Sequence, residues 1–271
     1  MNFTVLGAGG FIGRNLVGYL RNDGHEVWTP SRDNLEVLSE PLGTVFYCIG
    51  LTADFRKRPL DTVEAHVCVL NRLLQKANFD RMIYLSSTRV YLGLNGLVSE
   101  DVSLKANPHE FSDLYNLSKL MGESICLHSG QDVVVARLSN VVGLNFESEN
   151  FIFDLIREAC DKGVIQLRSA AESVKDYVLV TDVIRSLHAL ANHKNPKRIY
   201  NVASGRNLSN GQICDLIAKA EDCRWEVLAE TPIQAFPHID ISLARQELGL
   251  DPIDVLDVLS ELIREYRLKK G

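Results

Sequence analysis

A glycine turn stands between an apolar strand and an amphipathic helix at the start of this chain. Residues 2–6 are predominantly apolar, and Gly7, Gly10 and Gly13 follow them at once. Residues 14–20 continue with apolar positions at helical spacing. Gly7 permits a sharp turn, Gly10 lets the backbone approach a phosphate, and Gly13 lets the helix pack closely on the strand. The order predicts a device that binds a dinucleotide pyrophosphate at the helix N-terminus; the alternative is a glycine-rich turn without a ligand.

Strand and helix patterns alternate along the chain. Apolar strands are predicted at 26–29, 45–49, 81–85, 133–138 and 199–202, and helices at 61–77, 112–128, 150–162, 177–192, 208–220 and 254–267. This alternation predicts an α/β fold of the Rossmann type, a doubly wound parallel sheet with a small C-terminal substrate-binding lobe. Residues 1–141 plus about 175–206 are expected to bind the dinucleotide. About 142–174 plus 207–271 are expected to form the lobe.

Charge and cysteine content exclude several classes of partner. The chain has 29 Lys and Arg against 35 Asp and Glu, a net charge of −6. That balance argues against nucleic acid or an anionic membrane surface as the main partner. No apolar run approaches the ~20 residues of a membrane span, and the N-terminus does not resemble a signal peptide. The six cysteines form no CxxC pair. We therefore expect a cytoplasmic protein with reduced cysteines and no metal site.

A tyrosine and a lysine four residues apart lie on one predicted helix. A nearby ammonium stabilises a phenolate, so Lys119 is expected to lower the pKa of Tyr115 from about 10. That would make Tyr115 a general acid or base. Tyr266 and Lys270 have the same spacing, but they follow neither a glycine turn nor a strand that ends in serines. The alternative for Tyr115 is a half-buried tyrosine beside a solvated lysine.

Taken together, the motifs resemble the extended short-chain dehydrogenase/reductase family, which includes nucleotide-sugar epimerases, dehydratases and ketoreductases. The resemblance covers nearly the whole chain. Gly7-x-x-Gly10-x-x-Gly13 resembles the cofactor turn, and Tyr115-x-x-Ser118-Lys119-x-x-x-Glu123 the catalytic helix. Further matching segments are 85–91, 137–143, 175–183 and 200–205.

The resemblance implies roles for the catalytic residues. Tyr115 would exchange a proton with a sugar oxygen, and Ser87, identified by its register with Tyr91, would hydrogen-bond that oxygen. Lys119 would hold the nicotinamide ribose and tune Tyr115. Hydride would pass between an NAD-type cofactor and the adjacent sugar carbon. The implied contacts to the cofactor are Gly7, Gly10, Phe11, Ile12, Gly13, Tyr115 and Lys119.

The resemblance also implies contacts to a nucleotide-sugar substrate. Asn140 falls where relatives contact the nucleotide diphosphate. Lys175 stands where many carry an arginine for that diphosphate, and lysine keeps the charge without the bidentate fork. Asn150 and Phe151 fall near the usual contact to the base. The alternative for both is a helix N-terminus and core packing.

Departures from the family pattern bear on the cofactor. Members that prefer NAD usually end the second strand with an acidic residue that holds the ribose hydroxyls. This chain has Ser31 at that position and Arg32 next to it, and an arginine can pair with a 2′-phosphate. Arg14 is a second candidate. The pattern favours NADP over NAD; the alternative is a solvated loop arginine. The stretch 31–44 is also short for a strand–helix unit.

A second departure bears on the reaction. Dehydratases of this family place an acidic pair directly after the catalytic serine or threonine, where this chain has Thr88 and Arg89. The leading hypothesis is therefore an NADP-linked reductase of a 4-keto nucleotide sugar. A 4-epimerase with tightly bound NAD and a non-catalytic NAD(P)-binding regulatory protein are the alternatives. The resemblance further implies a role in polysaccharide biosynthesis and a homodimer that pairs through helices 61–77 and 112–128. The alternative for Val67, Leu70 and Leu74 is ordinary core packing.

Overall fold

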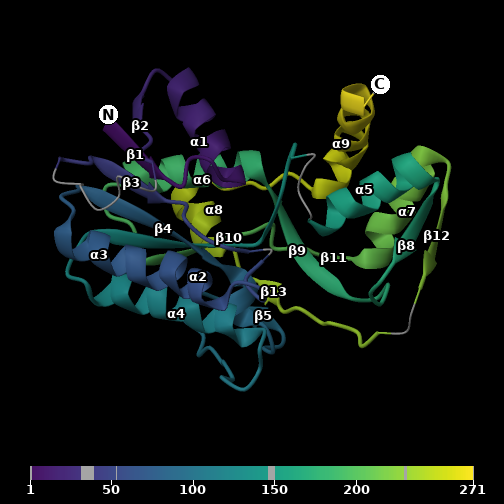
Figure 1. Cartoon of the computed structure of the whole chain (residues 1–271), viewed down its shortest axis with the longest axis horizontal. Helices are drawn as coiled ribbons and strands as arrows, with labels where there is room; N and C mark the ends of the chain where they lie inside the picture. The colour runs from purple at the N-terminus through teal and green to yellow at the C-terminus, as the bar shows by residue number, and fades with distance from the viewer. Residues whose placement is uncertain (1, 32–39, 53, 146–149, 229–230, 271) are drawn as a thin grey trace.

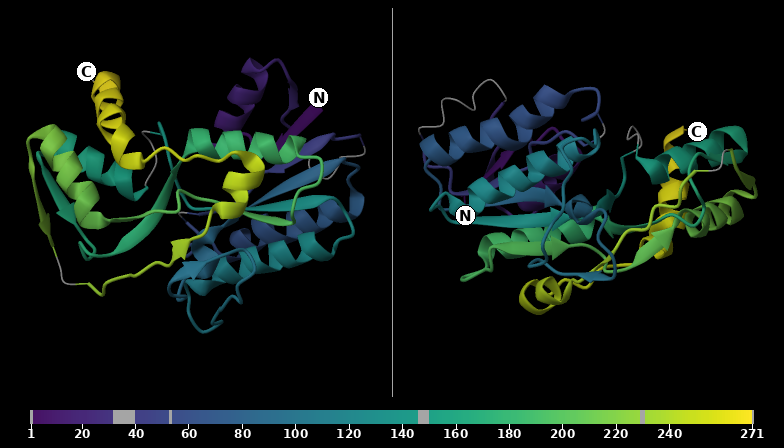
Figure 2. Two further views of the ribbon diagram at one scale, coloured as in Figure 1. Left: turned by 180° about the vertical axis from the view of Figure 1, so that it is seen from behind. Right: turned by 90° about the horizontal axis from the view of Figure 1, so that it is seen from below.

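The fold consists of two bodies that lie side by side (Figure 1). The computed structural model describes residues 2–31, 40–52, 54–145, 150–228 and 231–270. Arg32, a predicted cofactor contact, lies outside these residues. One body contains a six-stranded sheet with helices on both faces, and the other contains small sheets covered by helices (Figure 2).

The six-stranded sheet confirms the predicted Rossmann-type architecture. Its order is β10-β6-β4-β3-β1-β2, and each neighbouring pair is parallel. The strand order reverses beside β1, which is where doubly wound sheets bind ligands. Among the described residues β2 is the edge strand beside β1. The chain passes from β2 to β3 with no described strand or helix that could extend the sheet beyond β2. The strands are β1 Asn2–Leu6, β2 Glu26–Trp28, β3 Thr44–Tyr47, β4 Arg81–Ser87, β6 Val133–Leu138 and β10 Ile199–Val202.

Helices bury both faces of this sheet. One face packs with α1 Phe11–Asn22, α6 Val180–Asn192 and α8 Ser242–Leu248. The opposite face packs with α3 Val69–Lys76 and α4 Asp113–His128. The helix predicted at 61–77 is divided into α2 Pro59–Val63, a π-helical turn Glu64–Cys68 and α3.

The second body has its own hydrophobic core, built from three helices and two small sheets. Strands β11, β9 and β7 form one sheet, and β12 pairs with β8 in the other. The core lies between these strands and α5, α7 and α9. The elements are β7 Asn140–Val142, α5 Phe151–Lys162, β8 Val164–Leu167, β9 Val174–Leu179, β11 Asn207–Ser209, α7 Asn210–Glu221, β12 Arg224–Val227 and α9 Val255–Lys270.

Two features differ from the sequence prediction. Residues 177–179 end β9 rather than begin a helix, because they pair with β7. Tyr177 consequently belongs to the core of the second body. In the other direction, Ala244 and Leu250 pack into the core of the first body, although they fall within the predicted lobe. The short strands β5 Leu97–Val98 and β13 His238–Ile239 pair with each other in a separate two-stranded sheet.

Two residues of the helix expected at the dimer interface belong to the core of the first body. Leu70 and Leu74 pack under the sheet, as the core alternative predicted, and Val67 is half-buried. The six cysteines are free thiols, of which Cys126 and Cys214 are buried. No helix in the described part of the chain is long and apolar enough to cross a membrane.

Candidate active site

The glycine turn forms a tight cradle between β1 and α1. A Cβ on Gly13 would lie 2.3 Å from the carbonyl oxygen of Gly7, and a Cβ on Gly7, at φ +83°, would lie 2.9 Å from the Cys48 carbonyl. The N-cap of α1 is Gly10, which has no side chain to cap the helix, and the first turn has no acidic residue. The first-turn N–H groups therefore remain available to an anion. These features fit a dinucleotide pyrophosphate.

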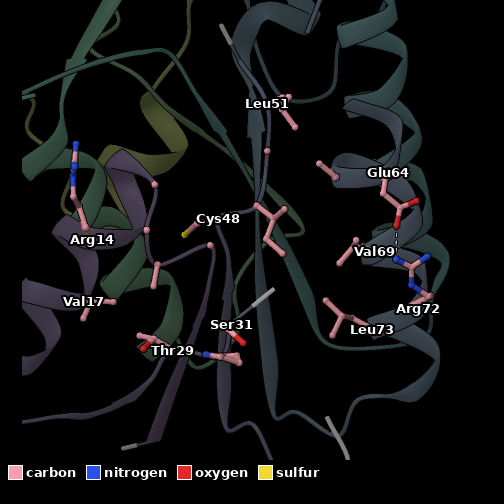
Figure 3. A pocket seen from close by; sticks show the side chains of 18 of the residues that line it. Arg14, Val17, Thr29, Ser31, Cys48, Leu51, Glu64, Val69, Arg72 and Leu73 are labelled. Carbon is pink, nitrogen blue, oxygen red and sulfur yellow. Dashed lines mark hydrogen bonds and ion pairs between the residues drawn. The ribbon is translucent and has the colours of Figure 1, made fainter. Parts of the chain in front are cut away.

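A cavity of about 1190 Å³ opens from this cradle (Figure 3). It runs from Gly7–Gly10 past Ser31 to Gly50 and Leu51, the residues that follow β3. Its far wall is α3, and Arg72 forms an ion pair there with Glu64. Of the predicted cofactor contacts, Ser31 is exposed and lines this cavity. Arg14 also lines it, and its guanidinium donates to Asn145 Oδ1 at 2.7 Å.

Tyr115 and Ser87 meet at the carboxyl end of β4. The Ser87 hydroxyl is near enough to act on the Tyr115 phenol, which is only 4% exposed and carries the Phe55 ring at a centroid distance of 5.3 Å. Burial raises the pKa of Tyr115 above 10, while the Ser87 hydrogen bond and the charge of Arg89 oppose this increase. The predicted lowering of the pKa by Lys119 is thus wrong for this structure. The prediction from helical spacing took no account of desolvation, which disfavours the charged phenolate of a buried tyrosine.

Lys119 lies deep beside the same site. Its Nζ donates to the Leu85 carbonyl at 2.8 Å and lies 6.0 Å from the centroid of the Tyr115 ring. Burial lowers the pKa of Lys119 to about 8, although Glu123 opposes that shift. A Cβ on Gly50 would lie 3.7 Å from Nζ. The ammonium therefore lies between Tyr115 and the strand end that borders the cavity.

A buried histidine connects this strand end to the tyrosine helix. The Leu51 N–H donates to Nε2 of His66 at 3.2 Å, so Nε2 is an acceptor and the neutral ring carries its proton on Nδ1. Nδ1–H then donates to Ser118 Oγ at 2.8 Å, and Ser118 Oγ donates to the Tyr115 carbonyl at 2.8 Å. Burial, reinforced by the charge of Lys119, lowers the pKa of His66 to about 2.

The predicted substrate contacts gather where the two bodies meet. Asn140 begins β7 and donates from Nδ2 to the Asp176 carbonyl at 2.7 Å. Lys175 extends its Nζ over the ring of Phe151 at 5.8 Å. Asn150 caps α5 by accepting from the Phe153 N–H at 3.0 Å, as the helix N-terminus alternative predicted. Phe151 is half-buried and packs against the second core.

A family model described as the NAD dependent epimerase/dehydratase family matches residues 3–203. The chain belongs to this family. Curated relatives include a dTDP-glucose 4,6-dehydratase of Streptomyces griseus, 27% identical over 68% of this chain and 58% of the relative. A dTDP-4-dehydro-6-deoxyglucose reductase of Escherichia coli is 24% identical over 90% of this chain and 78% of the relative. The first of these matches therefore spans less than two thirds of the relative's length.

Solved structures of the epimerase/dehydratase fold agree with this architecture. MoeE5 in complex with UDP-glucose and NAD superposes with a TM-score of 0.86 at 22% identity over 100% of both chains. Structures that share the fold hold either NAD or NADPH. The family name and the glycine cradle together identify an NAD-type dinucleotide as the cofactor.

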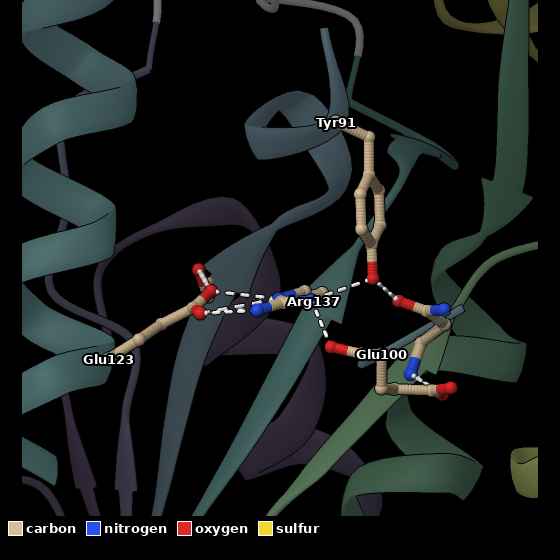
Figure 4. A network of polar contacts seen from close by, with 6 residues as sticks. Tyr91, Glu100, Glu123 and Arg137 are labelled. Atoms are coloured by element: carbon tan, nitrogen blue, oxygen red, sulfur yellow. Dashed lines mark hydrogen bonds and ion pairs between the residues drawn. The ribbon is translucent and has the colours of Figure 1, made fainter. Parts of the chain in front are cut away.

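A buried ion pair joins α4, the helix that carries Tyr115, to strand β6 of the sheet (Figure 4). Arg137 Nη2 lies 2.7 Å from Glu123 Oε2, and both side chains are at most 4% exposed. Ser86 Oγ donates to the same carboxylate at 2.5 Å. Arg137 also donates to the Tyr91 hydroxyl at 2.7 Å. The network therefore orients β4 directly before Ser87.

Sequence reasoning missed three residues that contact this site. His66 had a signal, since it is a lone polar residue on an otherwise apolar helix face. Arg89 enters the sequence analysis only because it stands where dehydratases of the family carry an acidic residue. Phe55 lies in a loop without periodicity, and only the tertiary structure brings it onto Tyr115.

One group of potential metal ligands lies far from these residues in the sequence. Ligand atoms of Asp23, His25 and His188 all lie within 4.8 Å of one another. The two imidazoles pack edge-on against Phe3 at 5.0 and 6.1 Å. Packing on Phe3 positions the two histidines, and Asp23 Oδ2 lies 3.1 Å from His25 Nε2.

Proposed function

We propose that this family member reduces a 4-keto nucleotide sugar with NADPH. The observation that carries the proposal is the placement of Ser87 beside Tyr115, with Lys119 behind them, at the sheet edge that holds the glycine cradle. Thr88 is buried and Arg89 is a cation, so neither supplies the acid and base that sugar dehydration needs. A reductase needs only one proton donor beside the carbonyl oxygen.

The protonation state of Tyr115 supports reduction. Because burial raises its pKa, the phenol keeps its proton at neutral pH and can donate it to a substrate oxygen. Ser87 is close enough to Tyr115 for both hydroxyls to address that oxygen. Bound NADPH would supply the hydride. Lys119, still mostly an ammonium at pH 7, places a positive charge near the oxygen as it gains negative charge.

Basic residues around the cavity support NADP as the cofactor. Ser31 occupies the end of the β2 segment where an acidic residue would repel a 2′-phosphate, and Arg14 and Arg21 line the same cavity. Arg32 is proposed to join them. The glycine cradle and Lys119 would hold the pyrophosphate and the nicotinamide ribose, and Asn140, Phe151 and Lys175 the nucleotide diphosphate and base.

The alternatives use the same residues. A 4-epimerase with tightly bound NAD would use Ser87, Tyr115 and Lys119, but Tyr115 would first have to lose its proton. A non-catalytic NAD(P)-binding regulator would need none of the three. We also propose that the second body forms most of the substrate lobe, and that two copies pair through α2–α3 and α4. Sedimentation at twice the 30.3 kDa chain mass would support that dimer.

The test starts with the cofactor. Protein denatured after purification should release little NAD, and the purified protein should bind NADPH more tightly than NADH. With dTDP-4-dehydro-6-deoxyglucose or GDP-4-dehydro-6-deoxymannose it should consume NADPH, and Tyr115→Phe should lower kcat by about 10²–10⁴. Copurifying NAD, with turnover and no net change in cofactor, would instead establish the epimerase. If Tyr115→Phe changed no measurable function, the regulator would be favoured.

A further inference from the structure

Cationic side chains surround the reacting end of the site. The guanidinium carbon of Arg89 lies 5.6 Å from the ring centroid of Phe55, and that of Arg56 lies 4.5 Å from the same centroid. The Phe55 ring packs directly on Tyr115. Two like charges therefore share one aromatic ring that touches the proposed proton donor.

These cations have no anionic partner in the described part of the chain. Arg56, Arg89 and Lys175 form no ion pair there, and the Nε of Arg89 is buried without a hydrogen-bond partner. The carboxylate of Asp113 faces Arg89 at longer range, but its oxygens accept from the Asn107 N–H and Asn116 Nδ2. Because Nε is inaccessible to solvent, an external anion would pair with the Nη groups of this guanidinium, which are not fully buried.

The charges also repel one another. Burial lowers the pKa of Arg89, and the positive charge of Arg56 lowers it further. Burial lowers the pKa of Lys175 in the same way, and the charge of Arg89 adds to that effect. An anion bound among them would relieve this repulsion.

The position of Arg89 separates it from the diphosphate contact. Its own N–H donates to Ser87 Oγ at 3.2 Å, so its backbone is anchored to the proposed catalytic pair. Its charge also acts on Tyr115. Lys175, in contrast, lies over Phe151 on the second body. Arg89 therefore lies beside the proposed catalytic pair, whereas Lys175 packs on the second body.

We propose that Arg89, assisted by Arg56, binds a carboxylate on the substrate sugar close to the reacting carbon. The two Nη groups form the end of the guanidinium fork, which matches a carboxylate bidentately. The substrate class is then a nucleotide-linked sugar acid. This inference rests on the proposed function, because it needs a nucleotide sugar beside Tyr115. It makes Arg89 a specificity-determining residue.

The experiment measures binding rather than turnover. Calorimetry in saturating NADP compares UDP-glucose with UDP-glucuronic acid, and GDP-mannose with GDP-mannuronic acid. Each pair differs only in the carboxylate. The wild-type protein should bind the acid of at least one pair about tenfold or more tightly. Arg89→Gln should abolish that preference and change the affinity for the neutral sugar less than about threefold. Arg89→Lys should retain part of it.

The controls separate this inference from the proposed function. Arg264→Gln, on the exposed face of α9, should leave all affinities unchanged. If Arg89→Gln weakens both members of a pair equally, the guanidinium binds the diphosphate and the inference fails. If the wild type binds both members equally, the inference fails while the proposed function stands. If none of the four ligands binds, the inference fails, whereas the proposed function is judged by NADPH consumption with the 4-keto sugars. Unchanged circular dichroism and melting temperature would exclude misfolding of the variant.

Discussion

The Nδ1 atom of His66 lies 2.8 Å from Oγ of Ser118, and this contact joins the π-helical turn to the tyrosine helix. The imidazole is fully buried and stays neutral because its pKa is lowered to about 2. A π-helical turn widens the helix locally, and such turns occur often at functional sites. His66 thus holds Leu51, beside the cavity, and Tyr115 in one hydrogen-bonded chain.

This buried imidazole should make stability sensitive to acid. An unfolded histidine titrates near 6.5, so below that pH the unfolded state binds a proton that the folded state does not. The unfolding free energy should therefore fall as the pH decreases below 6.5, by about 2 kcal/mol between pH 7.5 and pH 5. His66→Asn should lack this component. Urea unfolding of both proteins at the two pH values measures it, and parallel pH profiles would contradict a neutral His66.

Lys119 should make the stability of the fold depend on pH in the alkaline range instead of the acidic range. Its pKa of about 8 in the fold lies below the 10.5 of an unfolded lysine, so the unfolded state binds more protons between these values. Below pH 8 the buried ammonium lowers the unfolding free energy by its full amount. The unfolding free energy should rise as the pH increases above 8. From pH 7 to pH 9.5 the wild type should gain about 2 kcal/mol relative to Lys119→Met. Chemical denaturation at both pH values tests this, and a constant difference would refute it.

The buried pair Glu123–Arg137 should be strongly coupled. Glu123→Leu leaves the Arg137 charge buried without its partner, which should cost about 3–5 kcal/mol of unfolding free energy. Adding Arg137→Met should recover much of that loss. A double-mutant cycle by urea denaturation measures the coupling. The exposed pair Glu261–Arg264 is the matched control and should couple by less than about 0.5 kcal/mol.

Two glycines of α1 offer a matched pair of alanine substitutions, one inside the glycine cradle and one outside it. Gly13→Ala would place a Cβ 2.3 Å from the Gly7 carbonyl oxygen, so the turn must open, and binding of NADPH should weaken by more than about tenfold. Gly18→Ala, on the exposed side of α1 and outside the cavity, meets no atom within 4 Å and should leave the affinity for NADPH unchanged. Calorimetric titration with NADPH distinguishes the two variants. Equal affinities would show that the close approach of α1 to β1 does not shape the binding site.

Local sequence patterns predicted the parts of the fold that depend on local contacts. The strand, glycine turn and helix at 2–22 follow from spacing alone, and so does the placement of Ser87 at a strand end. The pKa of Tyr115 was predicted in the wrong direction because Lys119 is a neighbour in sequence, whereas Phe55, which helps to bury the ring, is not. Residues 177–179 were assigned to a helix because their pairing with β7 leaves no mark on the sequence. His66 and Arg89 acquire their roles only from residues distant in the chain.

The path of the chain between the two bodies has a consequence for synthesis on the ribosome. Helix α8 completes the first core with Ala244, and the chain then crosses back so that α9 supplies Leu259 and Ile263 to the second. The first body cannot bury its apolar residues fully until α8 has emerged, and the second cannot do so until α9 has emerged. The first body, although it begins at the N-terminus, therefore lacks part of its core until the segment that carries Ala244 and Leu250 has been translated. The first core should therefore acquire full resistance to protease only after α8 has left the exit tunnel, and the second only after α9 has followed.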